Sequence, residues 1–212
     1  ALFASFGSHP VDEKGNIPFD SDGTREALEY MKKLCEYMPK EVYAWDDASN
    51  NTWIISGRGA GIQNPPSAWK VAVRDQIQTA SKLWHHDTPT GPKGRFRGSL
   101  TRMWGVWNFS KNKSAAKDLI LHLLHKEQQD QLIDISGGYD IPLIASFNKH
   151  PVWKYTGPPD GTLYNYPVQG DEFRMICGYP APATVSATLY DQALLPNTVA
   201  KVTQEGKSID DA

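Results

Sequence analysis

Helical periodicity that is cut short by proline and glycine is the feature that most constrains the fold of this chain. Apolar residues recur at helical spacing over about 22–38, where Pro39 ends the pattern. Four further stretches carry a comparable signal, and they predict helices over about 46–56, 67–83, 111–135 and 183–204. The chain is therefore expected to fold into several helices separated by breaks.

Extended segments are expected between these helices. Residues 60–63 form a short strand candidate, and apolar and polar residues alternate loosely over 95–109, which predicts a longer strand. Residues 87–94 hold Pro and Gly too densely for a helix and are expected to form an extended connector. Residues 150–182 are rich in Pro, Gly and Tyr, and we expect loop with short extended pieces there.

Charge and hydropathy exclude several classes of function. Among 212 residues, Lys and Arg number 22 and Asp and Glu number 24, so the formal net charge is −2. This balance favours neither a nucleic-acid groove nor an anionic-membrane patch. No apolar stretch approaches the roughly 18 residues of a membrane span. The two cysteines, Cys35 and Cys177, are too few for a disulfide framework and are expected to be buried free thiols.

Candidate metal ligands are sparse. His85, His86 and Asp87 are consecutive, so their side chains diverge, and no further His or Cys stands at a zinc-like spacing from them. His122 and His125 are three residues apart on a predicted helix, where a solvated face is the better interpretation. We therefore predict no metal site.

Acid–base chemistry has few candidates as well. Asp46 and Asp47 are adjacent, which on a helix sets their side chains about 100° apart, so they are better interpreted as residues that favour a helix start. The sequence has no Gly-x-Ser-x-Gly elbow, and the glycines of 57–61 lack the dinucleotide and phosphate-loop patterns. A carbohydrate-active hydrolase that uses Asp46, Asp47 or Glu172 stays open as an alternative.

Aromatic residues gather at the breaks between predicted elements. Four of them stand beside polar or turn-forming residues: Trp45, Trp69, Trp104 and Tyr179. Such rings suit a ligand with apolar and hydroxyl-bearing faces, sugars above all, because a ring covers C–H patches while polar groups bind the hydroxyls. The alternative is that most of these rings are buried in the core.

An ordered series of segments resembles a known family. Residues 89–96 and 104–118 closely resemble the family 1 extracellular solute-binding proteins of bacterial ABC importers. Other segments agree with that family in the same order, and they are 24–30, 45–51, 56–57, 64–68, 136–142 and 179–182. The resemblance covers nearly the whole chain, and its specificity lies in the series and not in any one motif.

The resemblance implies an α/β fold of the periplasmic-binding-protein-like type (type II, maltose-binding-protein-like). It implies that these segments make up the second half of a longer protein, so the chain is expected to be a fragment. The implied parts are a carboxy-terminal lobe over 1–98, a hinge strand over 99–107, a helical segment of the amino-terminal lobe over 108–147, and a return to the carboxy-terminal lobe over 148–212.

The function implied by the resemblance is binding without catalysis. Such a protein holds a solute, here a sugar or sugar-like molecule, in a cleft between two lobes, closes by hinge motion and delivers the solute to a membrane permease. The location is periplasmic or extracellular, at the membrane through the transporter, and no cofactor, metal or nucleic acid is involved. The cleft-facing candidates that the resemblance implies are Trp45, Asp46, Asn64, Trp69, Trp104, Gly105 and Tyr179.

Each candidate residue has an expected role. Stacking on the solute is expected of the four aromatic residues, and hydrogen bonding to its hydroxyls is expected of Asp46 and Asn64. Gly105 would allow close approach of the backbone. The sequence departs from many relatives at Pro66, where an aromatic ring often lies beside the loop, and this departure bears on the role of Trp69.

Two further expectations concern surfaces. A structural or partner-docking module is the third class of function, and a broad apolar surface without a cleft would favour it. The predicted helix over 111–135 is expected to expose apolar side chains such as Leu119 and Leu123, or to pair with a second copy of the chain.

Overall fold

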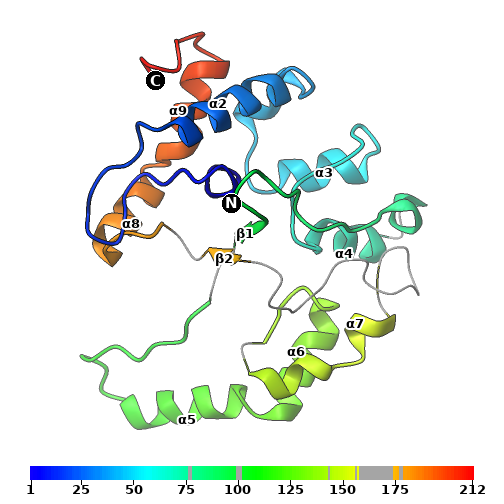
Figure 1. The fold of residues 1–212 in the computed structure, drawn as a ribbon. Helices are drawn as coiled ribbons and strands as arrows, with labels where there is room; N and C mark the ends of the chain where they lie inside the picture. The colour runs from blue at the N-terminus through cyan, green and yellow to red at the C-terminus, as the bar shows by residue number, and fades with distance from the viewer. Residues whose placement is uncertain (76–77, 99–101, 143, 156, 158–173, 177–178) are drawn as a thin grey trace. The chain divides into compact units, whose positions relative to one another are not determined.

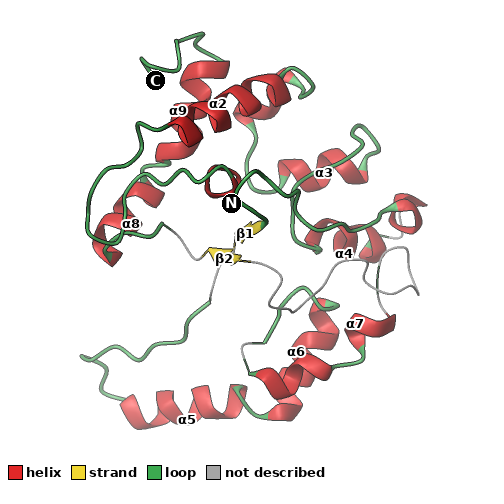
Figure 2. Cartoon of the chain, in the orientation of Figure 1, coloured by secondary structure: helices red, strands yellow, loops and turns green. Residues whose placement is uncertain are grey.

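The computed structural model describes residues 1–75, 78–98, 102–142, 144–155, 157, 174–176 and 179–212. The chain divides into two compact units, which we call unit 1 (Ala1–Trp45, Thr88–Thr101 and Asp171–Ala212) and unit 2 (Asp46–Asp87 and Arg102–Gly170). Helices dominate the described parts of both units (Figures 1 and 2).

The core of unit 1 forms where α2 (Asp22–Cys35) packs against α9 (Leu194–Thr203), as Figure 1 shows. Its buried apolar side chains are Phe3 from α1 (Leu2–Ser5), Ala27 and Leu28 from α2, and Val202 from α9. The Ser21 side chain accepts a hydrogen bond from the backbone N–H of Thr24 at 3.3 Å and so caps α2. The helix predicted over 22–38 is thus confirmed, although α2 itself ends at Cys35.

A short parallel pair of strands belongs to unit 1. Strand β1 (Phe96–Gly98) pairs with β2 (Arg174–Ile176), and Phe96 is in register with Arg174. The prediction of a strand over 95–109 is wrong for 102–107, which are irregular, and residues 99–101 lie outside the described part. The strand predicted over 60–63 is wrong as well, since these residues are irregular. Extended backbone becomes a strand only where a neighbouring strand takes up its hydrogen bonds.

Near the carboxyl end, one predicted helix is in fact two. The prediction of a continuous helix over 183–204 is wrong, because α8 (Ala183–Asp191) ends before α9 begins and Ala193 between them has φ 51°. Pro196 is the cause, since a proline inside a helix has no N–H to give and its ring collides with the preceding turn. The carbonyl of Gln192 instead accepts a hydrogen bond from the Asn197 side chain at 3.0 Å.

Unit 2 is built from short helices. They are α3 (Ser49–Ile55), α4 (Ser67–Arg74), the 3-10 helix η2 (Gln78–Lys82), α5 (Lys113–Leu123), α6 (Lys126–Ser136), the 3-10 helix η3 (Ala145–Lys149) and α7 (Val152–Tyr155). One buried cluster joins Trp69, Ile133, Phe147, Val152 and Trp153, and a second joins Ile54, Ile55, Ala68, Ala72 and Ala80.

In unit 1, a further 3-10 helix, η1 (Lys40–Ala44), follows α2.

The helix predicted over 111–135 is also two helices. It is broken before α6 because His125 is extended, with φ −60° and ψ 145°. The side chain of Gln129 donates a hydrogen bond to the Leu123 carbonyl at 2.7 Å, which helps to satisfy the end of α5. No residue of α5 is buried. Leu119 is exposed, as expected, whereas Leu123 is only half-buried.

The described residues are rich in helix and hold little sheet, with one parallel pair of three-residue strands, so they agree with the α/β prediction only in its coarse form. The predicted lobe boundaries at 98, 107 and 147 stay predictions. The structure places residues 46–87 in the same unit as 102–170. Cys35 is a half-buried free thiol, and Cys177 lies outside the described residues. Within the described ranges, no helix is long and apolar enough to cross a bilayer.

Candidate functional site

Asp46 organises the turn that leads into α3. Its carboxylate accepts hydrogen bonds from the Ser49 hydroxyl at 2.6 Å and from the backbone N–H of Ala48 at 3.1 Å. The Ser49 hydroxyl in turn accepts from the Asp46 backbone N–H at 3.1 Å. These bonds, that of Ser49 first, lower the pKa of Asp46, which keeps it ionised. Asp46 thus stabilises the turn before α3, whereas the interpretation of Asp46 and Asp47 as the helix start is wrong, because α3 begins at Ser49 with Ala48 as its N-cap and no acidic residue in its first turn.

Asn64 ties the loop after α3 to the beginning of α4. Its side-chain amide donates to Asn51 at 2.6 Å and to Ser67 at 2.9 Å, and its oxygen accepts from Asn50 at 3.3 Å. Both amide hydrogens and one acceptor site are thus used within unit 2. The geometry gives Asn64 a structural role in addition to any contact with a ligand.

Replacing Asn64 tests this role. We expect Asn64→Ala to lower the free energy of unfolding by about 1–3 kcal/mol, because Asn51 and Ser67 lose their partner in a half-buried setting. Urea denaturation followed by circular dichroism measures the change. The exposed neighbour Gln63 supplies the control, and Gln63→Ala should change the stability by no more than about 0.5 kcal/mol. Equal effects of the two variants would contradict the structural role.

Trp69 lies in the core of unit 2. Only 1% of its surface is exposed, and it packs with Ile133 and Trp153. A ring enclosed in this way has no face left for a solute, so the expected stacking role of Trp69 is corrected to a core role. The cause is its position on α4, whose apolar face turns toward α6 and the residues around α7.

Trp104 and Gly105 lie on irregular chain before α5. The Trp104 side chain is 66% exposed, and a Cβ built on Gly105 would meet nothing within 4 Å. Both positions are thus open to a ligand. Gly105 is not required by crowding, so its value for close approach of a backbone stays a prediction.

Trp45 and Tyr179 belong to unit 1, and both are half-buried. The backbone N–H of Tyr179 donates to the Ser186 hydroxyl at 3.1 Å, which fixes this residue against α8. Burial, and to a smaller extent Tyr190, raises the pKa of Tyr179. Tyr179 also borders a cavity of about 50 Å³ beside Phe3 and Leu195. This volume holds a water molecule or two, which is too little for a sugar.

A larger hollow in unit 2 is one that the sequence did not indicate. It has a volume of about 320 Å³, and the residues that line it are Ser67, Lys70, Val71, Leu132, Ile135, Ser136, Tyr139 and Asp140. None of the seven predicted site residues is among them. The sequence marks residues 136–142 only by their family resemblance, and no short sequence pattern indicates the packing of α4 against α6 that forms this hollow.

No group of three or more potential metal ligands occurs in the described part of the chain. His122 and His125 are both exposed, and their ring centres lie 6.3 Å apart. His85 is half-buried, and burial, with a smaller contribution from His86, lowers its pKa to about 4. It therefore carries no charge at neutral pH.

Comparison with known proteins decides the family. A family model described as bacterial extracellular solute-binding protein matches residues 1–158. The chain belongs to this family. No curated protein matches the chain.

The family fixes the general kind of function. A bacterial extracellular solute-binding protein acts in the periplasm or outside the cell and takes a small molecule as its ligand. Proteins of this family are generally non-enzymatic. The structure gives the hydrolase alternative no support, because Asp46 and Asp47 are exposed at the turn before α3 and line neither of the two cavities described above, and Glu172 lies outside the described residues.

Proposed function

We propose that this solute-binding protein takes up a sugar or sugar-like molecule and delivers it to the permease of an ABC importer. Membership of the family, over residues 1–158, is the observation that carries the proposal. The exposed indole of Trp104 beside Gly105 supports the sugar class, since a free aromatic face covers the C–H patches of a sugar ring.

The proposed site differs from the set expected from the sequence. Trp104 stacks on the solute. Gly105 has no side chain, so the polar edge of the solute can come close to the backbone there. Trp45, Tyr179, Asp46 and Asn64 stay in the proposal as further contacts in a cleft between lobes, and Trp69 is removed because it is buried. The cleft itself is what the family resemblance implies.

A calorimetric screen tests the solute class. The protein, as its gene encodes it, is titrated with monosaccharides, oligosaccharides, polyols and small polyamines. We expect heat of binding with at least one carbohydrate and none with the polyamines. Binding of a non-carbohydrate alone would refute the sugar class and leave the family function intact.

Trp104→Ala measures the proposed stacking. Loss of one desolvated stacking ring is expected to weaken sugar binding by about tenfold or more, in line with the cost of removing aromatic contacts. Trp84, which is 58% exposed elsewhere in unit 2, gives the matched control as Trp84→Ala. Titration by calorimetry compares the dissociation constants. Unchanged affinity in Trp104→Ala would remove this residue from the site.

A further inference from the structure

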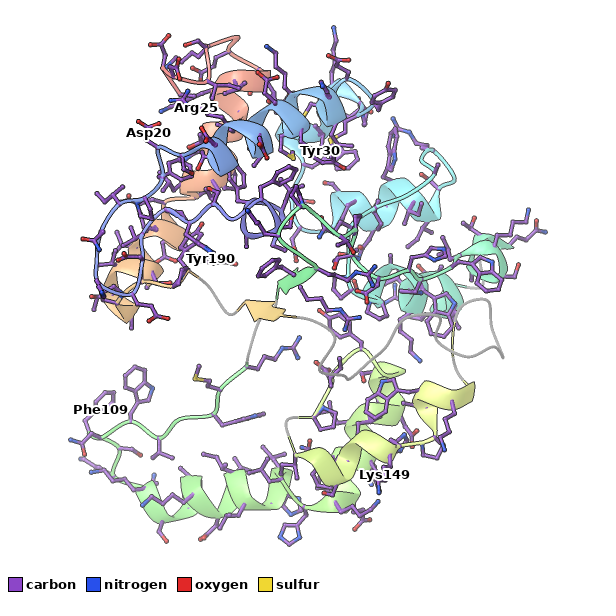
Figure 3. All side chains as sticks on the ribbon, viewed as in Figure 1. Asp20, Arg25, Tyr30, Phe109, Lys149 and Tyr190 are labelled. Atoms are coloured by element: carbon purple, nitrogen blue, oxygen red, sulfur yellow. The ribbon has the colours of Figure 1, made fainter. Side chains whose placement is uncertain are left out.

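Residues 102–112, which we call the aromatic arm, carry large aromatic side chains that are exposed to solvent. Trp107 and Phe109 are 72% and 80% exposed, and Figure 3 shows Phe109 extending from this segment. The two rings stack on each other with centres 5.4 Å apart and an angle of 20° between their planes. Together with Trp104, they offer three aromatic faces within six residues, which is more than one sugar ring requires.

The arm and the first turns of α5 carry more positive than negative charge. Residues 102–117 contain four basic residues and no acidic one, and the next residue, Asp118, is acidic, in a chain whose net charge is −2. The four are Arg102, Lys111, Lys113 and Lys117. Arg102 is paired with Asp140 at 3.0 Å, so the three exposed lysines carry the excess of positive charge. An anionic ligand is the electrostatic complement of this segment.

Lys113 places a positive charge close to the stacked rings of Trp107 and Phe109. Its ammonium group donates a hydrogen bond at 3.2 Å to the side-chain oxygen of Asn108, the residue between Trp107 and Phe109. A cation is therefore held beside the stacked pair, where a ligand covering these rings would bring its own charge within reach. The arrangement favours a ligand that combines stacking surface with negative charge.

The polar residues of the aromatic arm favour a sugar over a lipid bilayer as its ligand. The polar residues between and after the exposed rings are Asn108, Ser110 and Asn112. Insertion into a bilayer would bury their polar groups without hydrogen-bond partners. A sugar can instead exchange hydrogen bonds with them. A second copy of the chain would bring lysines against lysines in a symmetric contact, which is unfavourable.

We propose that the aromatic arm binds an acidic oligosaccharide, one that carries carboxylate groups along several sugar units. Trp107 and Phe109 cover the faces of the sugar rings next to the ring that stacks on Trp104. The carboxylates are attracted by the three exposed lysines, Lys111, Lys113 and Lys117. This inference rests on the proposed function and extends it, because it specifies both the charge and the minimum length of the solute.

The test compares two ligands that differ only in charge. Calorimetry with tetragalacturonate and with its carboxyl-reduced neutral counterpart is carried out at low and at high salt. We expect the acidic tetramer to bind about tenfold more tightly at low salt, and we expect this advantage to shrink at about 1 M NaCl, where charges are screened beyond roughly 3 Å.

Variants assign the effect to the arm. Lys113→Gln should weaken binding of the acidic tetramer by about threefold and leave the neutral tetramer unchanged. Lys126→Gln removes the same charge from α6, where Lys126 pairs with Asp130, and should alter neither ligand. Trp107→Ala combined with Phe109→Ala should weaken both tetramers but leave the binding of a single sugar unit intact.

The outcomes separate the two proposals. Equal affinity for the two tetramers overturns the acidic ligand and leaves sugar binding in place. Failure of both tetramers, together with failure of every carbohydrate in the screen, overturns the sugar class as well. Binding to phosphatidylglycerol vesicles that depends on Lys113 and Trp107, without binding of the tetramers, also overturns the inference and assigns the arm to a membrane.

Discussion

Trp69→Ala is expected to destabilise the protein by about 3–5 kcal/mol, because it removes a fully buried indole and leaves a cavity among Ile133, Phe147 and Trp153. Single domains are typically stable by about 5–15 kcal/mol, so this one change would bring unit 2 close to unfolding. Denaturation in urea, followed by far-UV circular dichroism, measures the loss.

Two further variants make this prediction decisive. Ile133, 1% exposed in the same cluster, gives a milder variant, and Ile133→Val is expected to cost about 0.5–1.5 kcal/mol even if Trp69→Ala does not fold. Trp84→Ala removes an indole that is 58% exposed and should be nearly neutral. Comparable losses in Trp69→Ala and Trp84→Ala would show that Trp69 is not a core residue.

The second large expected effect is a loss of folding stability at acidic pH, which His85 causes. Burial lowers the pKa of His85 to about 4, with His86 as a smaller cause, while the unfolded chain keeps a value near 6.5. Between these values, the unfolded state binds a proton that the folded state does not, so stability falls as the pH is lowered from about 6.5 to about 4. Below about 4, this group adds no further change.

Nuclear magnetic resonance measures this directly. The ring signal of His85 is expected to titrate with a midpoint near 4, and the His85→Gln variant should lose part of the pH dependence of unfolding between pH 7 and pH 4. The exposed His122 serves as the control, since His122→Gln should keep that dependence. A midpoint near 6.5 for His85 would refute the effect of burial. His85 also lies edge-on to Trp69, with ring centres 6.5 Å apart, so the Trp69→Ala cavity should move the midpoint upward.

Local signals predicted the helices well where a breaker or cap stands at the boundary. The Ser21 cap and the periodicity that ends before Pro39 delimit α2 closely. Pro66 precedes the start of α4 at Ser67, but the prediction of one helix over 67–83 is wrong, because α4 ends at Arg74 and the 3-10 helix η2 follows separately. Long predicted helices were wrong where a break depends on one residue. Pro196 divides the last helix, and the extended His125 divides α5 from α6 without any glycine or proline.

The candidate site shows the same division between local and tertiary information. The resemblance indicated Trp104 and Gly105, and the structure leaves both open to solvent. It also indicated Trp69, which the structure buries, because whether a helical tryptophan faces a ligand or a core depends on the helices packed against it. The hollow between α4 and α6 depends wholly on such packing, which no local sequence pattern indicates.

The break at Ala193 separates two helices that differ in how firmly they are held. Helix α9 buries Thr198 and Val202, whereas α8 buries none of its residues. Backbone amides in α8 can therefore exchange with solvent through local opening, while those of α9 wait for the rarer disruption of the packing around α2. Because the left-handed residue Ala193 separates the two helices, α8 can open locally while α9 stays packed.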